Sequence, residues 1–350
     1  MLLKDINANL GFEFILTISA FLVSMFLTPI YTNFAYKHKL WKRQKSVAVT
    51  GEKLTVMNKL HADKIKRHFP TMAGTIMLLA VPIVIFAGII WRGNHDLVRG
   101  QIWLPLAGFI AGGVIGFIDD VLNLFGKNAV AGLRAPVKFA MIAAVGLALG
   151  WFFSYKLGWT EVTIPFVGSI GLGVVGMTIL FAFAVVATGN AVNITDGLDG
   201  LAGGLAMEAY GAYGLIALMQ EQWYLAGFCF VVIGALLSYI WFNIYPARFM
   251  MGDTGSFALG AGLGVVAMMT NSFFLLPVIG LLFVLEIASS AIQIFSKKVF
   301  HRKIFVSAPI HHHLQAKGWE ETKVVMRFWV IGGVLALLGV FLAMSGGIIK

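Results

Sequence analysis

The chain has 350 residues, of which 59% are hydrophobic and only 12% charged, and its formal net charge is +10. Soluble domains are usually about 45–50% apolar, so this composition excludes a soluble globular protein. The basic excess is accompanied by no stacked-aromatic or helical reading module, which excludes nucleic-acid binding, and the single cysteine excludes an intrachain disulfide.

Apolar runs of about 20 residues recur along the chain, and charges, glycines and prolines mark their ends. The first run has a weakly charged start and no small-residue cleavage signature, so it reads as a retained span and not as a signal peptide. The predicted fold class is all-α: a polytopic membrane protein with about ten transmembrane helices, forming a single domain over residues 1–350. The predicted spans are 11–35, 70–91, 102–118, 135–154, 169–187, 201–219, 223–243, 255–271, 273–295 and 326–347.

Basic residues are distributed unevenly over the loops. The loops that follow odd-numbered spans hold 21 of the 26 lysines and arginines, ten of them in residues 37–67 and seven in 297–327. The positive-inside rule therefore predicts that these loops face the cytoplasm and that both termini are extracytoplasmic. The basic loops can serve to hold the anionic leaflet, and they are equally compatible with an anionic substrate from the cytosol.

Five aspartates lie at the predicted cytoplasmic ends of spans: Asp119, Asp120, Asp196, Asp199 and Asp253. A carboxylate near hydrocarbon costs several kcal/mol unless it is paired, metal-bound or facing water, so each is a functional candidate. On a helix the adjacent pair Asp119-Asp120 would point about 100° apart, so one can contact a metal or take a proton while the other orients it. As a dipeptide, the pair fits an ordinary helix end facing the cytosol equally well.

The segment NAVNITDGLDG, residues 190–200, is more specific. Asp196 and Asp199 are three residues apart and are predicted to share a helical face, and Asn190 and Asn193 repeat that spacing. The glycine between the acids leaves the backbone open for a ligand. This strip suits a nucleotide or hydrated Mg²⁺. A simple turn is the alternative, because Asn, Asp and Gly favour turns.

MGDTGS, residues 251–256, places Asp253 at the start of the eighth span. An acid there can be a mere helix cap. Mg²⁺, however, takes only one or two carboxylates and fills its other positions with water and phosphate oxygens, so Asp253 is the predicted ligand.

Three consecutive histidines follow a proline in APIHHHLQAKGW, residues 308–319. A structural zinc site is excluded by the absence of a nearby cysteine or acidic partner. Imidazoles that face a phosphate fit better, because they donate hydrogen bonds and can gain charge.

Taken in order, these motifs resemble the polyprenyl-phosphate N-acetylhexosamine-1-phosphate transferase superfamily, from about residue 66 onward. The segments that carry the resemblance are GFIDD at 116–120, GLRAPVKF at 132–139, NAVNITDGLDGLAGG at 190–204, WFNIYPA at 241–247, MGDTGSFALG at 251–260 and SAPIHHHLQAKGWEETKVVMRFW at 307–329. The last segment is most similar to the branch whose donor is UDP-N-acetylmuramoyl-pentapeptide.

The resemblance implies a Mg²⁺-dependent site on the cytoplasmic face of a bacterial inner membrane, where a phospho-sugar passes from a UDP donor to undecaprenyl phosphate and UMP leaves. It implies catalytic roles for Asp119, Asp120, His312 and His313, and metal binding by Asp253 and Asn190. The implied substrate-binding residues are Lys66, Arg67, Lys138, Asn190, Asn193, Asp196, Gly197, Leu198, Asp199, Asn243, Met250 and Gln293.

The chain departs from the family pattern at four places. FPTMAG at 69–74 replaces Thr-Pro-Thr-Met-Gly-Gly, Val121 replaces a frequent tyrosine, Asn123 replaces the usual lysine and Met250 replaces the usual aromatic residue. The change at Met250 removes a stacking surface for uracil and is expected to affect nucleobase affinity, not chemistry.

Several alternatives stay open at this level. The lipid phosphate can attack directly, or the reaction can pass through an aspartyl-phosphate. A sister transferase that uses UDP-N-acetylglucosamine is the nearer alternative function. An ion-coupled transporter is more distant, because it would carry acids near span centres and an internal repeat. A homodimer is one option for the oligomeric state.

Overall fold

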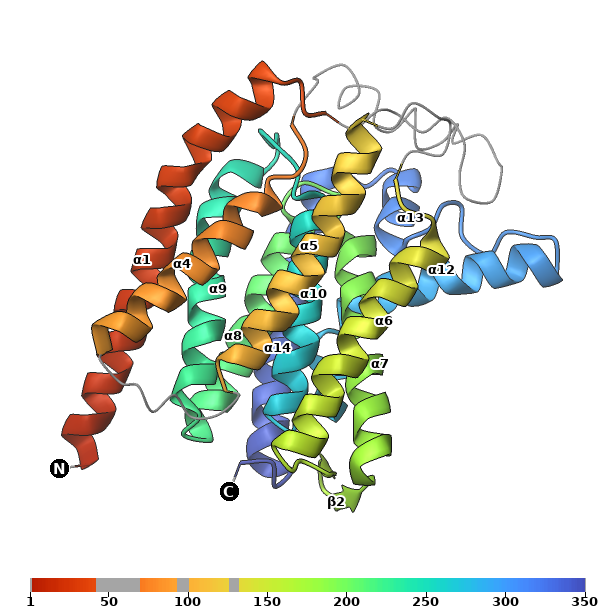
Figure 1. The fold of residues 1–350 in the computed structure, drawn as a ribbon. Helices are drawn as coiled ribbons and strands as arrows, with labels where there is room; N and C mark the ends of the chain where they lie inside the picture. The colour runs from red at the N-terminus through yellow and green to blue at the C-terminus, as the bar shows by residue number, and fades with distance from the viewer. Residues whose placement is uncertain (1, 42–69, 93–100, 126–131, 350) are drawn as a thin grey trace.

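A computed structural model describes residues 2–41, 70–92, 101–125 and 132–349. These residues form a bundle of long helices with one short hairpin (Figure 1). In chain order the elements are α1 (Leu2–Lys37), α4 (Gly74–Arg92), α5 (Trp103–Phe125), α6 (Ala135–Trp151), the π-helical turn η1 (Phe152–Lys156), β1 (Glu161–Ile164), β2 (Gly168–Gly171), α7 (Gly173–Thr195), α8 (Leu201–Met219), α9 (Trp223–Asn243), α10 (Gly252–Met269), the 3₁₀ turn η2 (Phe273–Leu275), α11 (Leu276–Ile279), α12 (Leu281–Val299), α13 (Ile310–Ala316) and α14 (Glu321–Ser345).

The prediction of an all-α polytopic membrane protein is confirmed. Within the described ranges, eight helices are long and apolar enough to cross a membrane, and the bent pair 273–279 and 281–299, which meets at 82°, makes a ninth if counted as one span. The remaining predicted span, 255–271, corresponds to α10. All residues of α10 are buried, so this helix is surrounded by protein and does not need a lipid-facing surface.

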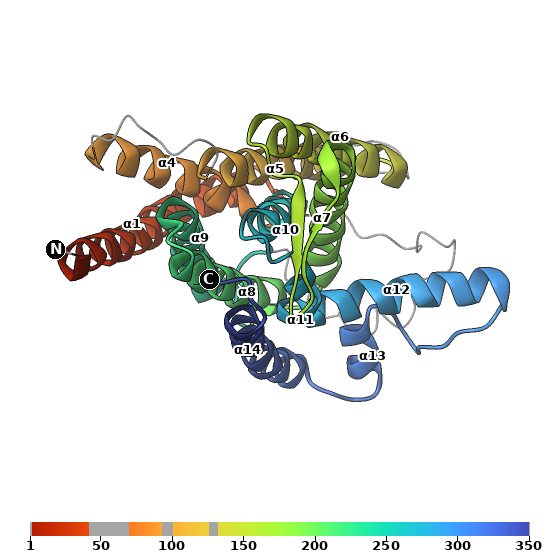
Figure 2. The ribbon, with the colours of Figure 1, turned by 90° about the horizontal axis from the view of Figure 1, so that it is seen from below.

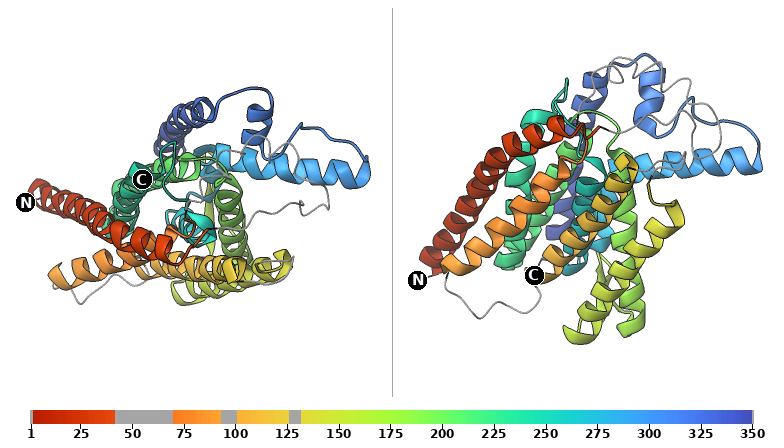
Figure 3. Two further views of the ribbon diagram at one scale, coloured as in Figure 1. Left: turned by 90° about the horizontal axis from the view of Figure 1, so that it is seen from above. Right: turned by 45° about the horizontal axis from the view of Figure 1, so that its top comes forward.

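Helix α10 lies at the centre of the bundle and packs most extensively against α5 and α7 (Figures 2 and 3). Glycines one turn apart on α5 make the close approach possible. A Cβ on Gly112 would lie 2.8 Å from the Cβ of Ala261, and one on Gly116 would lie 2.7 Å from the amide nitrogen of Thr254. The contact at Gly116 brings the last turns of α5 against the first turn of α10, which carries Asp253.

Two predicted span ends differ from the structure where buried polar residues continue a helix. The span 102–118 extends to Phe125, so Asp119 and Asp120 lie inside α5 and not at its end. The span predicted at 169–187 is helix α7, which covers 173–195. The polar residues that suggested an earlier end form hydrogen bonds within the helix. Thr188 Oγ1, for example, donates to the carbonyl oxygen of Ala184 at 2.7 Å. By contrast, α8 and α9 begin and end at the predicted residues.

The antiparallel hairpin β1–β2, in which Glu161 pairs with Gly171, overlaps the predicted span 169–187 and was not expected. The hairpin and both chain ends lie at one end of the bundle, and α13 lies toward the other end (Figure 1). Helix α12 projects sideways from the bundle (Figure 3). The side of the membrane that each end faces stays a prediction.

Candidate active site

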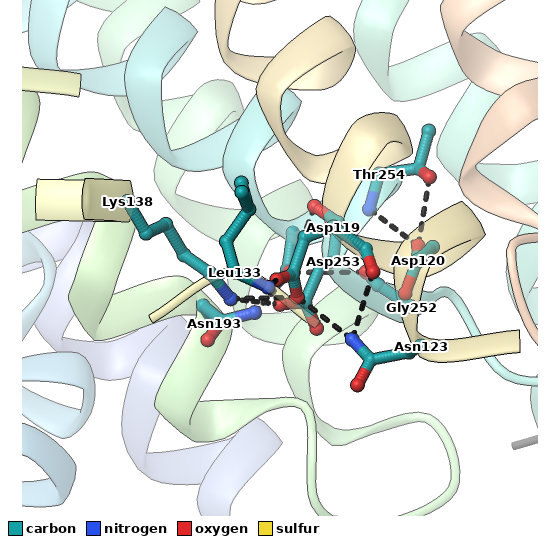
Figure 4. A network of polar contacts seen from close by, with 10 residues as sticks. Asp119, Asp120, Asn123, Leu133, Lys138, Asn193, Gly252, Asp253 and Thr254 are labelled. Carbon is teal, nitrogen blue, oxygen red and sulfur yellow. Dashed lines mark hydrogen bonds and ion pairs between the residues drawn. The ribbon is translucent and has the colours of Figure 1, made fainter. Parts of the chain in front are cut away.

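A lysine lies between two carboxylates from different helices. Nζ of Lys138, in the first turn of α6, is 2.8 Å from Oδ2 of Asp119 on α5 and 2.5 Å from Oδ2 of Asp253 on α10 (Figure 4). Asp119 and Asp253 are buried, at 2% and 8% exposure. Two carboxylates this close repel each other when both are charged, and the ammonium group between them offsets that repulsion.

Asp119 is held by further donors. Its Oδ1 accepts a hydrogen bond from the amide of Leu133 at 2.6 Å, and its Oδ2 accepts one from Nδ2 of Asn123 at 3.0 Å (Figure 4). Asn123 was noted in the sequence only as a departure from the family pattern, and the Leu133 contact uses backbone, which carries no sequence signal. Together these donors fix the position of the carboxylate.

Asp120 binds different partners, as the 100° offset predicts. Its Oδ2 accepts hydrogen bonds from the amide of Thr254 at 2.9 Å and from Thr254 Oγ1 at 2.8 Å. Gly252, two residues before Thr254, has φ +75°, and a Cβ there would lie 2.7 Å from the same oxygen of Asp120. Thr254 was not singled out in the sequence, although it belongs to MGDTGS. Because it follows Asp253 directly, the acid pair and the start of α10 form one polar network.

The strip after residue 190 divides into two parts. Asn190 and Asn193 lie in the last turns of α7, where Nδ2 of Asn193 donates to Oγ of Ser256 at 2.9 Å and Nδ2 of Asn190 donates to the carbonyl oxygen of Val186 at 2.8 Å. The prediction that Asp196 and Asp199 share a helical face is wrong. Helix α7 ends at Thr195, and both acids lie in the turn between α7 and α8. Gly200, the last residue before α8, has φ +80°.

Predicted binding residues anchor this α7–α8 turn. Oδ2 of Asp199 accepts a hydrogen bond from the amide of Ala247 at 3.0 Å, and Oδ1 of Asn243 accepts one from the amide of Gly200 at 2.8 Å. The Glu321 carboxylate, which the sequence analysis missed, accepts from the amide of Asp199 at 2.8 Å. Leu198 is fully buried within the turn. Met250 lies nearby, with its sulfur 4.0 Å from Nδ2 of Asn243.

The remaining predicted residues lie on α12 and α13. The Gln293 amide binds the connection between these helices: Nε2 donates to the carbonyl oxygen of Phe305 at 2.9 Å, and Oε1 accepts from the amides of Ile304 and Phe305 at 3.0 Å. His312 is buried, with Nδ1 3.0 Å from Oε1 of Gln315.

His313 is the partly exposed histidine of the run. Its Nδ1 lies 3.2 Å from the amide nitrogen of Val306 and accepts that hydrogen bond. Burial, and then the ammonium group of Lys317, lower the pKa of His313. Both observations describe a neutral imidazole whose proton is on Nε2, where it can donate to a phosphate oxygen.

The donor set around Lys138 fits a divalent cation. Asp119 and Asp253 each direct an oxygen at one cationic group, and one or two carboxylates are what Mg²⁺ takes from a protein. The described residues contain no cluster of three or more His, Cys, Asp or Glu side chains arranged for a metal. Asn190 uses its amide nitrogen within α7, which leaves its side-chain oxygen as the atom for a ligand. Lys66 and Arg67 lie outside the described residues.

Comparison with known proteins adds a second line of information. Residues 102–271 match the model of glycosyl transferase family 4. The chain is 35% identical to the phospho-N-acetylmuramoyl-pentapeptide-transferase of Lactobacillus acidophilus over 94% of this chain and 97% of the relative. The protein of the same name from Geobacillus thermodenitrificans is 35% identical over 92% and 95%, and that from Neisseria meningitidis serogroup C is 39% identical over 79% and 80%.

Proposed function

Because the chain belongs to the phospho-N-acetylmuramoyl-pentapeptide-transferase family, we propose that it transfers phospho-N-acetylmuramoyl-pentapeptide from its UDP donor to undecaprenyl phosphate and releases UMP. The product would be a lipid-linked peptidoglycan precursor. The observation that carries the proposal is the Lys138 ammonium between Asp119 and Asp253, beside the Asp120–Thr254 contact. With a divalent cation bound by these carboxylates, the site would neutralise the clustered negative charge of phosphate groups.

In phosphoryl transfer the protein mostly positions the reactants and neutralises their charge. Here a diphosphate donor and a phosphate acceptor must approach each other, and Lys138 would offset part of their repulsion. Asp253 and Asp119, with the Asn190 side-chain oxygen, would hold Mg²⁺, which when bound supplies further positive charge to the diphosphate. The Asn190–Asn193 strip and the α7–α8 turn, including Asp196 and Gly197, would receive the uridine and diphosphate.

The two acids of the pair are proposed to have different roles. Both carboxylate oxygens of Asp119 accept hydrogen bonds, from the Leu133 amide, Asn123 and Lys138, which suits a positioning role. We therefore assign to Asp120 the removal of a proton from the lipid phosphate, whose oxygen then attacks the sugar-linked phosphorus and displaces UMP. His312 and His313 would donate hydrogen bonds to donor phosphate oxygens.

The location of the reaction follows from the nature of the acceptor. A polyprenyl chain stays in hydrocarbon while its phosphate reaches a polar site at the interface. We propose that this interface is the cytoplasmic face of a bacterial inner membrane, because 21 of the 26 basic residues lie in the loops on that side of the predicted topology.

The test uses the purified protein in nanodiscs with undecaprenyl phosphate and Mg²⁺. UMP release is measured with UDP-N-acetylmuramoyl-pentapeptide and, in parallel, with UDP-N-acetylglucosamine at equal concentration. We expect faster turnover of the muramoyl donor. Faster turnover of UDP-N-acetylglucosamine would overturn the donor assignment while leaving the phosphoryl-transfer site intact. A burst of UMP without lipid phosphate would replace direct attack by the aspartyl-phosphate route.

A further inference from the structure

Glu286 is an acid within α12 that the proposed reaction does not use. Its Oε2 lies 2.8 Å from Nδ1 of His311, and the two side chains are 0% and 1% exposed. His311 is the first histidine of the run on α13. A buried carboxylate is tolerated when it is paired, and removing one partner of such a pair is strongly unfavourable. The pair therefore joins α12 to α13 across the intervening connection, 300–309.

Helix α13 depends on such contacts for its orientation. It has only seven residues and no side-chain hydrogen bond at its N-cap, so it is too short to be stable alone. The connection before it is held by Gln293 and by Ser296, whose Oγ donates to the carbonyl oxygen of Arg302 at 2.9 Å. The contact between Glu286 and His311 holds the helix itself.

The opposite edge of the His311 ring contacts the α7–α8 turn. A Cβ placed on Gly197 would lie 2.9 Å from Cε1 of His311 and still closer to its Nε2. The His311 ring also lies edge-on to the ring of His312, with centroids 4.1 Å apart. The imidazole of His311 is thus enclosed by Glu286, Gly197 and His312, and the last two belong to the candidate substrate site.

We propose that Glu286 is a positioning residue that, through His311, holds α13 and His312 against the α7–α8 turn and thereby controls donor binding. A carboxylate that accepts the Nδ1 proton fixes both the tautomer and the orientation of an imidazole. Without it, the His311 ring can rotate away from Gly197, and α13 loses its register with the turn. This inference rests on the proposed function, in which that turn receives the nucleotide.

The prediction separates the two substrates. The lipid phosphate is proposed to meet Asp120 on α5, so its KM reports on another part of the site. In Glu286→Leu, which removes the acceptor at similar volume, we expect the donor KM to rise about tenfold, with kcat and the lipid KM within about twofold of wild type. Glu286→Gln keeps one acceptor oxygen and replaces the other by an amide nitrogen, so we expect an intermediate effect, a donor KM about threefold higher.

Gly197→Ala perturbs the same contact from the other side. Gly197 does not have a left-handed φ, so an effect of alanine reports the contact with His311 and not backbone strain. We expect a similar rise in donor KM. The double variant with Glu286→Leu should have a donor KM no higher than that of the more impaired single variant, because the two changes disrupt one unit. Glu208→Gln is the control, because Glu208 on α8 is another acid with a buried carboxylate oxygen, and it should keep the wild-type KM values.

An unchanged donor KM in Glu286→Leu would overturn the proposal. A lower kcat together with a rise in both KM values and a lower Tm would also overturn it, because that pattern shows a merely structural role. If Glu286→Leu does not fold, Glu286→Gln decides by the same criterion. If the wild-type protein prefers UDP-N-acetylglucosamine, the proposed donor fails, and the same KM comparison with that donor still tests the positioning role.

Discussion

Gly116 determines how closely the acid pair approaches Asp253, and Gly116→Ala is therefore the sharpest test of the site geometry. A Cβ at this position would lie 2.7 Å from the amide nitrogen of Thr254, and the carbonyl carbon and oxygen of Asp253 would be nearer still. These are backbone atoms of α10 and cannot rotate away. The substitution must therefore separate α5 from α10.

The required separation can be bounded from the structure. Ordinary contacts begin at 3.4 Å, so the Thr254 amide alone demands a shift of about 0.7 Å, and the Asp253 carbonyl demands more. A misplacement of about 1 Å can cost about 10²-fold in rate, and overpacking typically costs about 1–3 kcal/mol. We expect transfer to fall about a hundredfold in Gly116→Ala with a modest loss of thermal stability.

The assay is UMP release in nanodiscs, accompanied by thermal unfolding of the same preparation. Gly211→Ala on α8 is the matched control, because a Cβ there meets nothing within 4 Å and alanine is the better helix former by about 1 kcal/mol. We expect Gly211→Ala to keep its turnover, with a Tm equal to or above that of the wild type. Turnover of Gly116→Ala within threefold of wild type would refute the argument that glycine contacts set the distance between the carboxylates.

Three further predictions concern the metal, the lysine and the topology. Asp253→Ala should abolish transfer while the protein still folds, because the Lys138 ammonium keeps Asp119 as its partner; near-normal turnover at limiting Mg²⁺ would show that Asp253 does not hold the metal. Lys138→Met leaves the Asp119 and Asp253 oxygens facing each other without a cation. We expect its Tm to fall and to recover with added Mg²⁺ by more than the wild-type Tm rises, and an equal Mg²⁺ response in both proteins would contradict this. A reporter that is active only in the cytoplasm should be silent when fused to the C-terminus, whereas an active fusion would reverse the topology.

The sequence could predict helices wherever apolar runs are punctuated clearly. The ends of α8 and α9 match the prediction because glycine and a run of polar residues, Gln220 to Gln222, interrupt the apolar pattern there. The ends of α5 and α7 were misplaced because buried polar side chains interrupt the same pattern without ending the helix. Hydrophobicity alone does not distinguish a polar residue that leaves the membrane from one that faces another helix.

The candidate site was predictable by residue type but not by pairing. Asp119, Asp253 and Lys138 were all recognised, yet Lys138 and Asp253 are 115 positions apart in the chain, and their contact depends on how α6 and α10 pack. The partners that no motif supplied include the Leu133 amide and the Thr254 hydroxyl. Such groups become visible only when the helices are assembled, because local sequence does not specify which backbone amide a carboxylate will meet.

The histidine run shows the same limit within a single helical turn. Adjacent residues on a helix point about 100° apart, so three consecutive histidines cannot share one environment. His311 is buried against Glu286, His312 is buried beside Gln315, and His313 is partly exposed and accepts from the Val306 amide. The resemblance to a known family selected the last two as catalytic residues. The resemblance did not select His311, which lies on α13 and contacts Gly197 in the α7–α8 turn. Its partner is Glu286, an acid within the predicted span 273–295 to which the sequence assigned no role.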